Sequence, residues 1–174
     1  IGYGGMGGAV FLLAMLAGMV VAPRVRDRMD QAAPAASPRS KMDIRALTPS
    51  YAVSPQIALS DLPAIKAAGF TTVIDNRPDG EIPAELHTPH MKAAAEALGL
   101  TFVANPVIGG ALTMENLAVQ RQAMAAATGP VFAYCASGNR CSVVWALMNA
   151  GQKPTDELIG TPAQYGYNLE PLRG

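Results

Sequence analysis

Apolar and polar positions follow two different periods along most of this chain. Short runs rich in β-branched and aromatic residues predict buried strands at residues 50–54, 70–74, 101–104 and 131–134. The segments between them carry helix-starting residues and end at glycines, which predicts helices over residues 60–68, 89–98 and 113–127. We therefore expect an α/β fold, with a mainly parallel sheet flanked by helices.

Polar loops follow three of the predicted strands. In a parallel sheet the carboxyl ends of the strands lie at one edge, where the reactive loops of α/β proteins gather. We expect three loops to meet there, namely residues 75–81, 105–111 and 135–140.

The third of these loops carries the strongest chemical signal. Cys135 follows a buried strand, and Arg140 leads into an apolar helix. A helix N-terminus, converging backbone N–H groups and a guanidinium all favour a thiolate and would also hold an anion. The predicted anion-binding residues are Ala136, Ser137, Gly138, Asn139, Arg140 and Cys141. The alternative is that Cys135 is an unreactive thiol at the end of a buried strand.

The N-terminal segment has a different pattern. Residues 1–23 contain no charged side chain and are apolar over 9–21, long enough for one transmembrane helix. The spacing of Ala14, Gly18 and Ala22 predicts a face that packs against other transmembrane subunits. A cleaved signal peptide is the rival interpretation.

Basic residues and then an Ala-, Pro- and Ser-rich stretch follow the apolar segment, which predicts a linker over residues 24–45 and a folded domain over 46–174. The basic residues place that domain in the cytoplasm by the positive-inside rule. The last part of the chain contains Tyr165, Tyr167 and Leu169, which we expect to serve packing.

Composition excludes several classes of protein. The 174 residues carry 13 basic and 13 acidic side chains, a balance that argues against a nucleic-acid partner. Two cysteines are too few for a disulfide framework. His87 and His90 lack a surrounding ligand cluster, so we expect neither a metal site nor a cofactor.

Three motifs together resemble a known family. Residues 73–81 (VIDNRPDGE), 105–110 (NPVIGG) and 134–140 (YCASGNR) are similar in order and spacing to the phosphatase-like domain of bacterial beta-lactamase hydrolase-like proteins, a sulfur transferase/phosphatase family. The resemblance covers about residues 46–172. It implies a fold similar to dual-specificity phosphatases, Cys135 as nucleophile and Arg140 as anion-binding residue. With the apolar segment, it implies a single-pass protein of a bacterial inner membrane.

The motifs depart from tyrosine phosphatases at the cradle. Tyr134 stands where those enzymes have His, and four residues rather than five separate Cys135 from Arg140, as in rhodaneses. Cys141 occupies the position of a Ser or Thr hydroxyl. We expect Cys141 to be a possible redox partner of Cys135, because a second thiol can cap the first as a disulfide.

The general acid is the second departure. A poor leaving group needs a proton donor, yet the loop at 105–111 has no acidic residue. Asp75, Asp79 and Glu81 on the neighbouring loop could substitute, and Asp79 at the turn tip is our first choice. The alternative is that residues 77–80 form a turn with an ion pair.

Three functions therefore remain open. The first is a membrane-anchored, cysteine-dependent phosphatase-like hydrolase acting on a small anion. The second is a rhodanese-like sulfur transferase that carries a persulfide on Cys135. The third is a non-catalytic or regulatory accessory subunit of a large membrane complex, with respiratory complexes among the candidate hosts.

Overall fold

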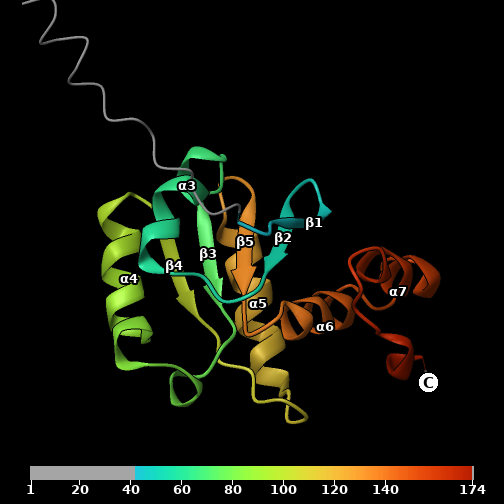
Figure 1. The fold of residues 1–174 in the computed structure, drawn as a ribbon. Coiled ribbons are helices and arrows are strands. Elements are labelled where there is room, and N and C mark those ends of the chain that lie inside the picture. The colour runs from blue at the N-terminus through green and yellow to red at the C-terminus, as the bar shows by residue number, and fades with distance from the viewer. Residues whose placement is uncertain (1–41, 174) are drawn as a thin grey trace, which may run out of the picture. The chain divides into compact units, whose positions relative to one another are not determined.

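A five-stranded sheet forms the centre of the computed structural model, which describes residues 42–173. The strand order is β1-β2-β5-β3-β4, and all neighbours pair in parallel except β1 with β2 (Figure 1). The four parallel strands therefore present their carboxyl ends at one edge. The strands are β1 Arg45–Thr48, β2 Tyr51–Ser54, β3 Thr72–Asp75, β4 Thr101–Ala104 and β5 Val131–Tyr134.

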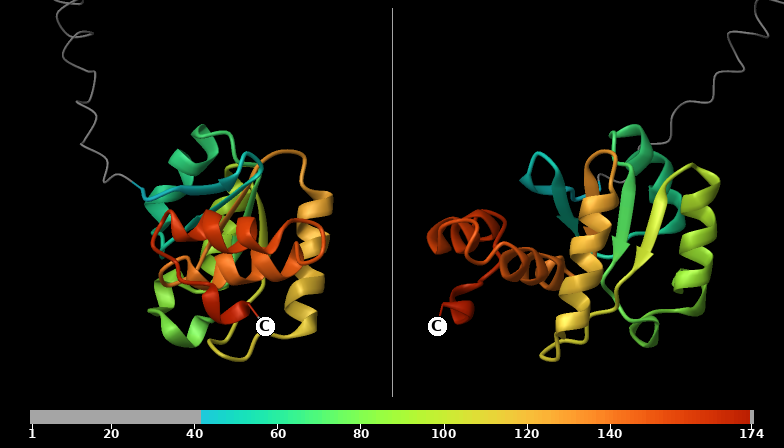
Figure 2. Two further views of the ribbon diagram at one scale, coloured as in Figure 1. Left: turned by 90° about the vertical axis from the view of Figure 1, so that its right-hand side faces the viewer. Right: turned by 180° about the vertical axis from the view of Figure 1, so that it is seen from behind.

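Helices cover both faces of this sheet, as the sequence predicts (Figure 2). The α-helices are α3 Leu62–Ala67, α4 Thr88–Ala97, α5 Met114–Ala126, α6 Asn139–Met148 and α7 Thr155–Ala163. Short 3-10 turns lie at η1 Leu59–Asp61, η2 Asp79–Glu81, η3 Ala84–Leu86 and η4 Glu170–Leu172.

Strand β5 shows how the two faces are separated. Phe132 and Tyr134 pack with residues of α3 and α4, whereas Val131 and Ala133 pack with residues of α6 and α7. This alternation follows from the two-residue period of a strand. Because β5 is central and buried on both faces, the residue that follows it, Cys135, is held in the core with no exposed surface.

The predicted elements at 101–104 and 131–134 match β4 and β5, and Thr113 caps α5 by accepting a hydrogen bond from the Asn116 N–H. The predicted helix at 60–68 begins with the 3-10 turn η1 and becomes α-helical at Leu62. These differences lie at the ends of the elements, which local sequence signals define poorly.

The linker prediction is wrong at its C-terminal end. Arg45, placed in the linker, is the first residue of β1, an edge strand that pairs through Arg45 with Val53. Of the four residues of β1, only Leu47 is buried, so the strand has too little apolar pattern to be recognised from the sequence.

The predicted transmembrane helix at 1–23, its small-residue face at Ala14, Gly18 and Ala22, and the linker up to residue 41 lie outside the described residues. Within residues 42–173, every helix falls short of the length and hydropathy that crossing a bilayer requires.

Candidate active site

The loop between β5 and α6 wraps around the sulfur of Cys135. Gly138 adopts a left-handed conformation with φ of 93°, and its N–H donates to Cys135 Sγ at 3.1 Å. The next residue, Asn139, begins α6, so the helix N-terminus is directed at the same region. The loop thus places a backbone N–H and a helix N-terminus beside the sulfur, and we call residues 135–141 the cradle.

The outer side of the cradle is held by hydrogen bonds to its carbonyl groups. The Ala136 carbonyl accepts from the Gln56 N–H at 3.3 Å. The Gly138 carbonyl accepts from the N–H of Ser142 at 3.1 Å and from its hydroxyl at 2.9 Å. Because the C=O and N–H of a trans peptide point in opposite directions, the bond to the Ala136 carbonyl helps to turn the Ser137 N–H toward the sulfur. The bonds to the Gly138 carbonyl belong to the first turn of α6.

These contacts produce a thiolate at neutral pH. The pKa of Cys135 is lowered to about 5, first by a hydrogen bond from the Cys141 thiol and then by the backbone N–H groups of Cys141, Ser137 and Gly138, against the opposing effect of burial. Burial raises the pKa of Cys141 well above its ordinary value, so that thiol keeps its proton and can donate. The two cysteines thus form a thiolate–thiol pair.

Arg140 closes one side of the cradle. Its Nη2 and Nη1 donate to the two carboxylate oxygens of Glu81 at 2.7 and 2.9 Å, and Nη1 also donates to the Val107 carbonyl at 2.8 Å. These contacts fix the guanidinium near the cradle, where its charge also interacts with Cys135. The contacts also bring all three predicted loops to one edge of the sheet, as expected.

Not every predicted cradle residue directs its amide at the sulfur. Ala136 and Ser137 are exposed, and the Asn139 N–H donates to the Ser137 hydroxyl at 3.3 Å. The Gly138 N–H donates to Cys135 Sγ at 3.1 Å, and the backbone N–H groups of Ser137 and Cys141 also lower the pKa of Cys135. Anion binding by the six residues remains a prediction, with these three amides and Arg140 best placed for it.

The three candidate acids have different surroundings. Asp79 Oδ1 accepts from the N–H and the hydroxyl of Thr88, at 2.9 and 3.1 Å, which makes it a cap for α4. These contacts agree with the alternative interpretation, in which residues 77–80 form a turn with an ion pair. The ion pair in this loop does not involve Asp79 but joins Arg77 to Glu81, at 3.4 Å. The role of Asp79 as a proton donor remains a prediction.

The other two acids are charged to different degrees. The hydrogen bond from Arg140 holds the pKa of Glu81 below its ordinary value, so Glu81 is an anion at neutral pH. Asp75 is buried, and desolvation raises its pKa to about 6. Asp75 and Asp79 both line a cavity of about 380 Å³ together with Arg77, Thr88 and Ile108.

The two histidines have different surroundings. The His87 ring Nε2 is 3.1 Å from the Ile82 carbonyl, and His90 is exposed. Residues 42–173 contain no group of three potential His, Cys, Asp or Glu metal ligands.

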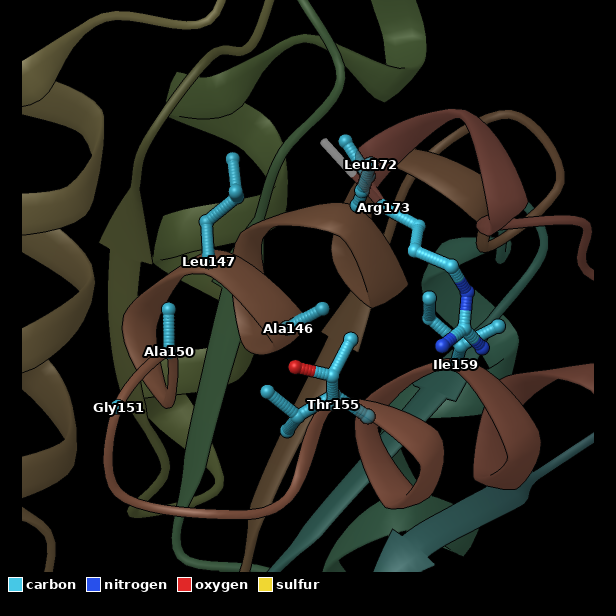
Figure 3. A pocket seen from close by; sticks show the side chains of 9 residues that line it. Ala146, Leu147, Ala150, Gly151, Thr155, Ile159, Leu172 and Arg173 are labelled. Atoms are coloured by element: carbon cyan, nitrogen blue, oxygen red, sulfur yellow. The ribbon is translucent and has the colours of Figure 1, made fainter.

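Another cavity, of about 480 Å³, lies between α6, α7 and η4 (Figure 3). Its lining is mostly apolar, with Leu147, Ile159 and Leu172, and Thr155 and Arg173 supply its polar groups. No residue of the cradle lines it, so the chemistry of Cys135 belongs to the opposite end of α6.

Sequence reasoning missed one contact of the cradle. Tyr167, predicted to serve packing, donates its hydroxyl to the Ser137 carbonyl at 2.7 Å. No local signal could have identified this bond, because 30 residues separate the partners.

A buried cysteine at the end of a central parallel strand, an amide cradle and an arginine at the start of the next helix define a phosphatase-like α/β domain. Comparison with known proteins gives the family. The chain belongs to the family described as "Beta-lactamase hydrolase-like protein, phosphatase-like domain", whose model matches residues 43–152.

Individual relatives agree with this assignment. A beta-lactamase hydrolase-like protein of Agrobacterium fabrum is 37% identical over 119 residues, which cover 67% of this chain and 28% of the relative. The chain thus spans about a quarter of the length of the curated relatives it matches. A phosphatase-like protein of Neisseria meningitidis Z2491, solved by crystallography, is 35% identical with a TM-score of 0.68, over 76% of this chain and 95% of that one.

A more distant structure shares the fold alone. Kinase associated phosphatase, solved with its catalytic-site cysteine replaced by serine, is 12% identical with a TM-score of 0.64, over 75% of this chain and 89% of that one. The expected similarity to dual-specificity phosphatases in fold is therefore confirmed.

Proposed function

We propose that this domain is a cysteine-dependent phosphatase that hydrolyses phosphate monoesters through a phosphocysteine on Cys135. The observation that carries the proposal is the setting of Cys135 Sγ, which accepts from the Gly138 N–H at 3.1 Å beside the charge of Arg140. The hydrogen bonds to Sγ lower the pKa of Cys135 to about 5 and so favour the thiolate. A thiolate is the nucleophilic form of cysteine, and the donors that stabilise it also bind phosphate oxygens.

The reaction has two steps. Cys135 Sγ attacks phosphorus, the S–P bond forms as the bond from phosphorus to the ester oxygen breaks, and the leaving oxygen takes a proton. Water then attacks phosphorus, releases inorganic phosphate and returns the electron pair of the S–P bond to Cys135. The Cys141 thiol supports this return, because its hydrogen bond stabilises the departing thiolate.

The proton for the leaving group is assigned to Asp79, and Asp75 is the second candidate. Both carboxyl groups line one cavity beside the three converging loops. Asp75 has a pKa of about 6, which suits proton donation, and Asp79 has the more exposed position of the two. Glu81 fits this role poorly because its ion pair with Arg140 stabilises the charged form.

Turnover of an aryl phosphate tests the proposal. The purified protein should release p-nitrophenolate from p-nitrophenyl phosphate, and Cys135→Ser should abolish the release. Phenyl phosphate has a poorer leaving group, so Asp79→Asn should slow its hydrolysis more than that of the nitro compound. If Cys135→Ser hydrolyses as fast as the natural chain, the thiolate mechanism is wrong.

A sulfur transferase is the second candidate, and the four-residue spacing between Cys135 and Arg140 favours it. In that reaction Cys135 Sγ takes the outer sulfur of thiosulfate with loss of sulfite, and cyanide removes it as thiocyanate. Thiocyanate formation that requires Cys135, without phosphate release, would favour this function over the first.

Membrane anchoring through residues 1–23, and the role of accessory subunit, are further proposals that rest on the apolar N-terminal sequence. Purification of the full chain in mild detergent separates them. A free anchored enzyme should migrate alone, whereas an accessory subunit should migrate with a large assembly, and recovery without detergent would contradict both.

A further inference from the structure

Tyr167 contacts the cradle from outside. It lies after α7, is only 6% exposed, and donates its hydroxyl to the Ser137 carbonyl at 2.7 Å. Burial raises the pKa of the Tyr167 hydroxyl, so this group keeps its proton and remains a donor.

The carbonyl that Tyr167 holds belongs to a functionally important peptide group. The C=O of Ser137 and the N–H of Gly138 are the two ends of one planar peptide. The Gly138 N–H donates to Cys135 Sγ at 3.1 Å. Tyr167 and Cys135 therefore bind opposite ends of the Ser137–Gly138 peptide dipole. The Tyr167 hydroxyl, bound to the C=O end, keeps the positive N–H end directed at the sulfur.

Gly138 makes this approach possible. A Cβ at this position would lie 2.1 Å from the Tyr167 Oη, and the φ of 93° also disfavours any side chain. Glycine is needed at this position both for the loop conformation and for the closeness of Tyr167.

Arg45 contacts the same tyrosine hydroxyl. Its Nη1 donates to the Tyr167 hydroxyl, and its guanidinium lies 5.1 Å from the centre of the Tyr167 ring. Asp43 forms an ion pair with Arg45. A donor to a hydroxyl oxygen polarises the O–H and strengthens the bond that it donates in turn.

We propose that Tyr167 is a positioning residue of the Cys135 site, which holds the Ser137–Gly138 peptide with its N–H on the thiolate, and that Arg45 supports it. The chain of contacts runs from β1 through the C-terminal segment to the cradle, and joins three parts of the sequence. The inference rests on the proposed function in one respect, that Cys135 reacts as a thiolate.

The test measures the thiolate directly and needs no substrate turnover. In the full chain, the rate of Cys135 alkylation by iodoacetamide is followed against pH, with the labelled residue identified by mass spectrometry. In Tyr167→Phe the midpoint of this profile should rise by about one pH unit, the effect of losing one hydrogen bond that supports a charged group.

Tyr165→Phe is the matched control. Its hydroxyl, also in the C-terminal segment, donates to the Ala46 carbonyl at 2.9 Å and does not contact the cradle. The midpoint in this variant should equal that of the natural chain, and a rise as large as in Tyr167→Phe would overturn the proposal.

Arg45→Gln provides a second measurement that leaves the tyrosine in place. We expect a smaller rise of the midpoint in this variant, and it decides the case if Tyr167→Phe does not fold. If Tyr167→Phe folds, an unchanged midpoint in that variant contradicts the inference. If Tyr167→Phe does not fold, an unchanged midpoint in Arg45→Gln contradicts it. A shifted midpoint without phosphate release would instead contradict only the proposed hydrolysis.

Discussion

The guanidinium of Arg140 and the carboxylate of Glu81 form a two-point ion pair, at 2.7 and 2.9 Å, although 59 residues separate them in the sequence. Arg77 also contacts this carboxylate, at 3.4 Å. Two guanidinium groups therefore share the single negative charge of Glu81, so one positive charge remains uncompensated within this group of three and is available to an anionic substrate at the cradle. The pair also orients Arg140, because a bidentate contact restricts its side chain.

Loss of the two-point contact with Glu81 should weaken anion binding through Arg140. In Glu81→Gln the amide cannot accept from both Arg140 nitrogens, so the guanidinium loses its orientation. We expect kcat/KM for p-nitrophenyl phosphate to fall about tenfold, the effect of one charged hydrogen bond. Glu85→Gln is the control, since Glu85 is exposed in the neighbouring turn η3. An equal fall in both variants would show that the loss is not specific to this ion pair.

The Cys141 thiol should set much of the acidity of Cys135. Its hydrogen bond is the largest cause of the lowered pKa of Cys135. Cys141→Ala should therefore raise that pKa above about 5, and Cys141→Ser, which keeps a donor, should raise it less or not at all. Thiolate absorbance near 240 nm against pH measures both. Identical titrations of the alanine and serine variants would refute this role.

Burial of Asp75 should make stability fall with rising pH over a defined window. Its pKa in the folded protein is about 6, against an ordinary value of 3.8. Between about pH 4 and pH 6 the folded state thus binds more protons than the unfolded state, and the unfolding free energy decreases as pH rises. Above about pH 6 both states are ionised, and below about pH 4 both are protonated, so the contribution is constant there.

Asp75→Asn should remove this decline. We expect the change in unfolding free energy between pH 4 and pH 7 to differ from that of the natural chain by about 2 kcal/mol, measured by urea unfolding. Asp156→Asn, at an exposed carboxylate paired with Arg173, is the control and should leave the decline intact. The prediction fails if Asp75→Asn follows the pH dependence of the control.

Mild peroxide should join the two cysteines of the cradle. The Cys135 thiolate attacks peroxide to give a sulfenic acid and hydroxide, and the Cys141 thiol then displaces water to form a disulfide. Peptide mass spectrometry without reduction should detect the crosslink. In Cys141→Ser the same treatment should carry Cys135 on to sulfinic acid. Sulfinic acid without crosslink in the natural chain would contradict this redox role.

Much of the cradle can be predicted from the sequence, because the residues that indicate it are close together in the chain. Four consecutive apolar residues, Val131 to Tyr134, predict the buried strand, and a cysteine, a glycine and an arginine follow within a few positions. The order of the strands then implies that their loops meet at one edge, and the contacts of Arg140 confirm this. Asp79 shows the limit, since its capping bond to Thr88 depends on a loop path that no pattern specifies.

The sequence by itself determined the α/β architecture and the family of the domain, and it singled out Cys135 as the candidate nucleophile, because periodicity and short motifs act over a few residues. Only the tertiary structure decided which groups support Cys135. Glu81 forms an ion pair with Arg140, Tyr167 donates to the Ser137 carbonyl, and Arg45, from an edge strand with little apolar pattern, donates to Tyr167. These contacts join residues 30 to 122 positions apart. Such pairs arise from the packing of strands and helices into layers, which brings together side chains that share no local pattern.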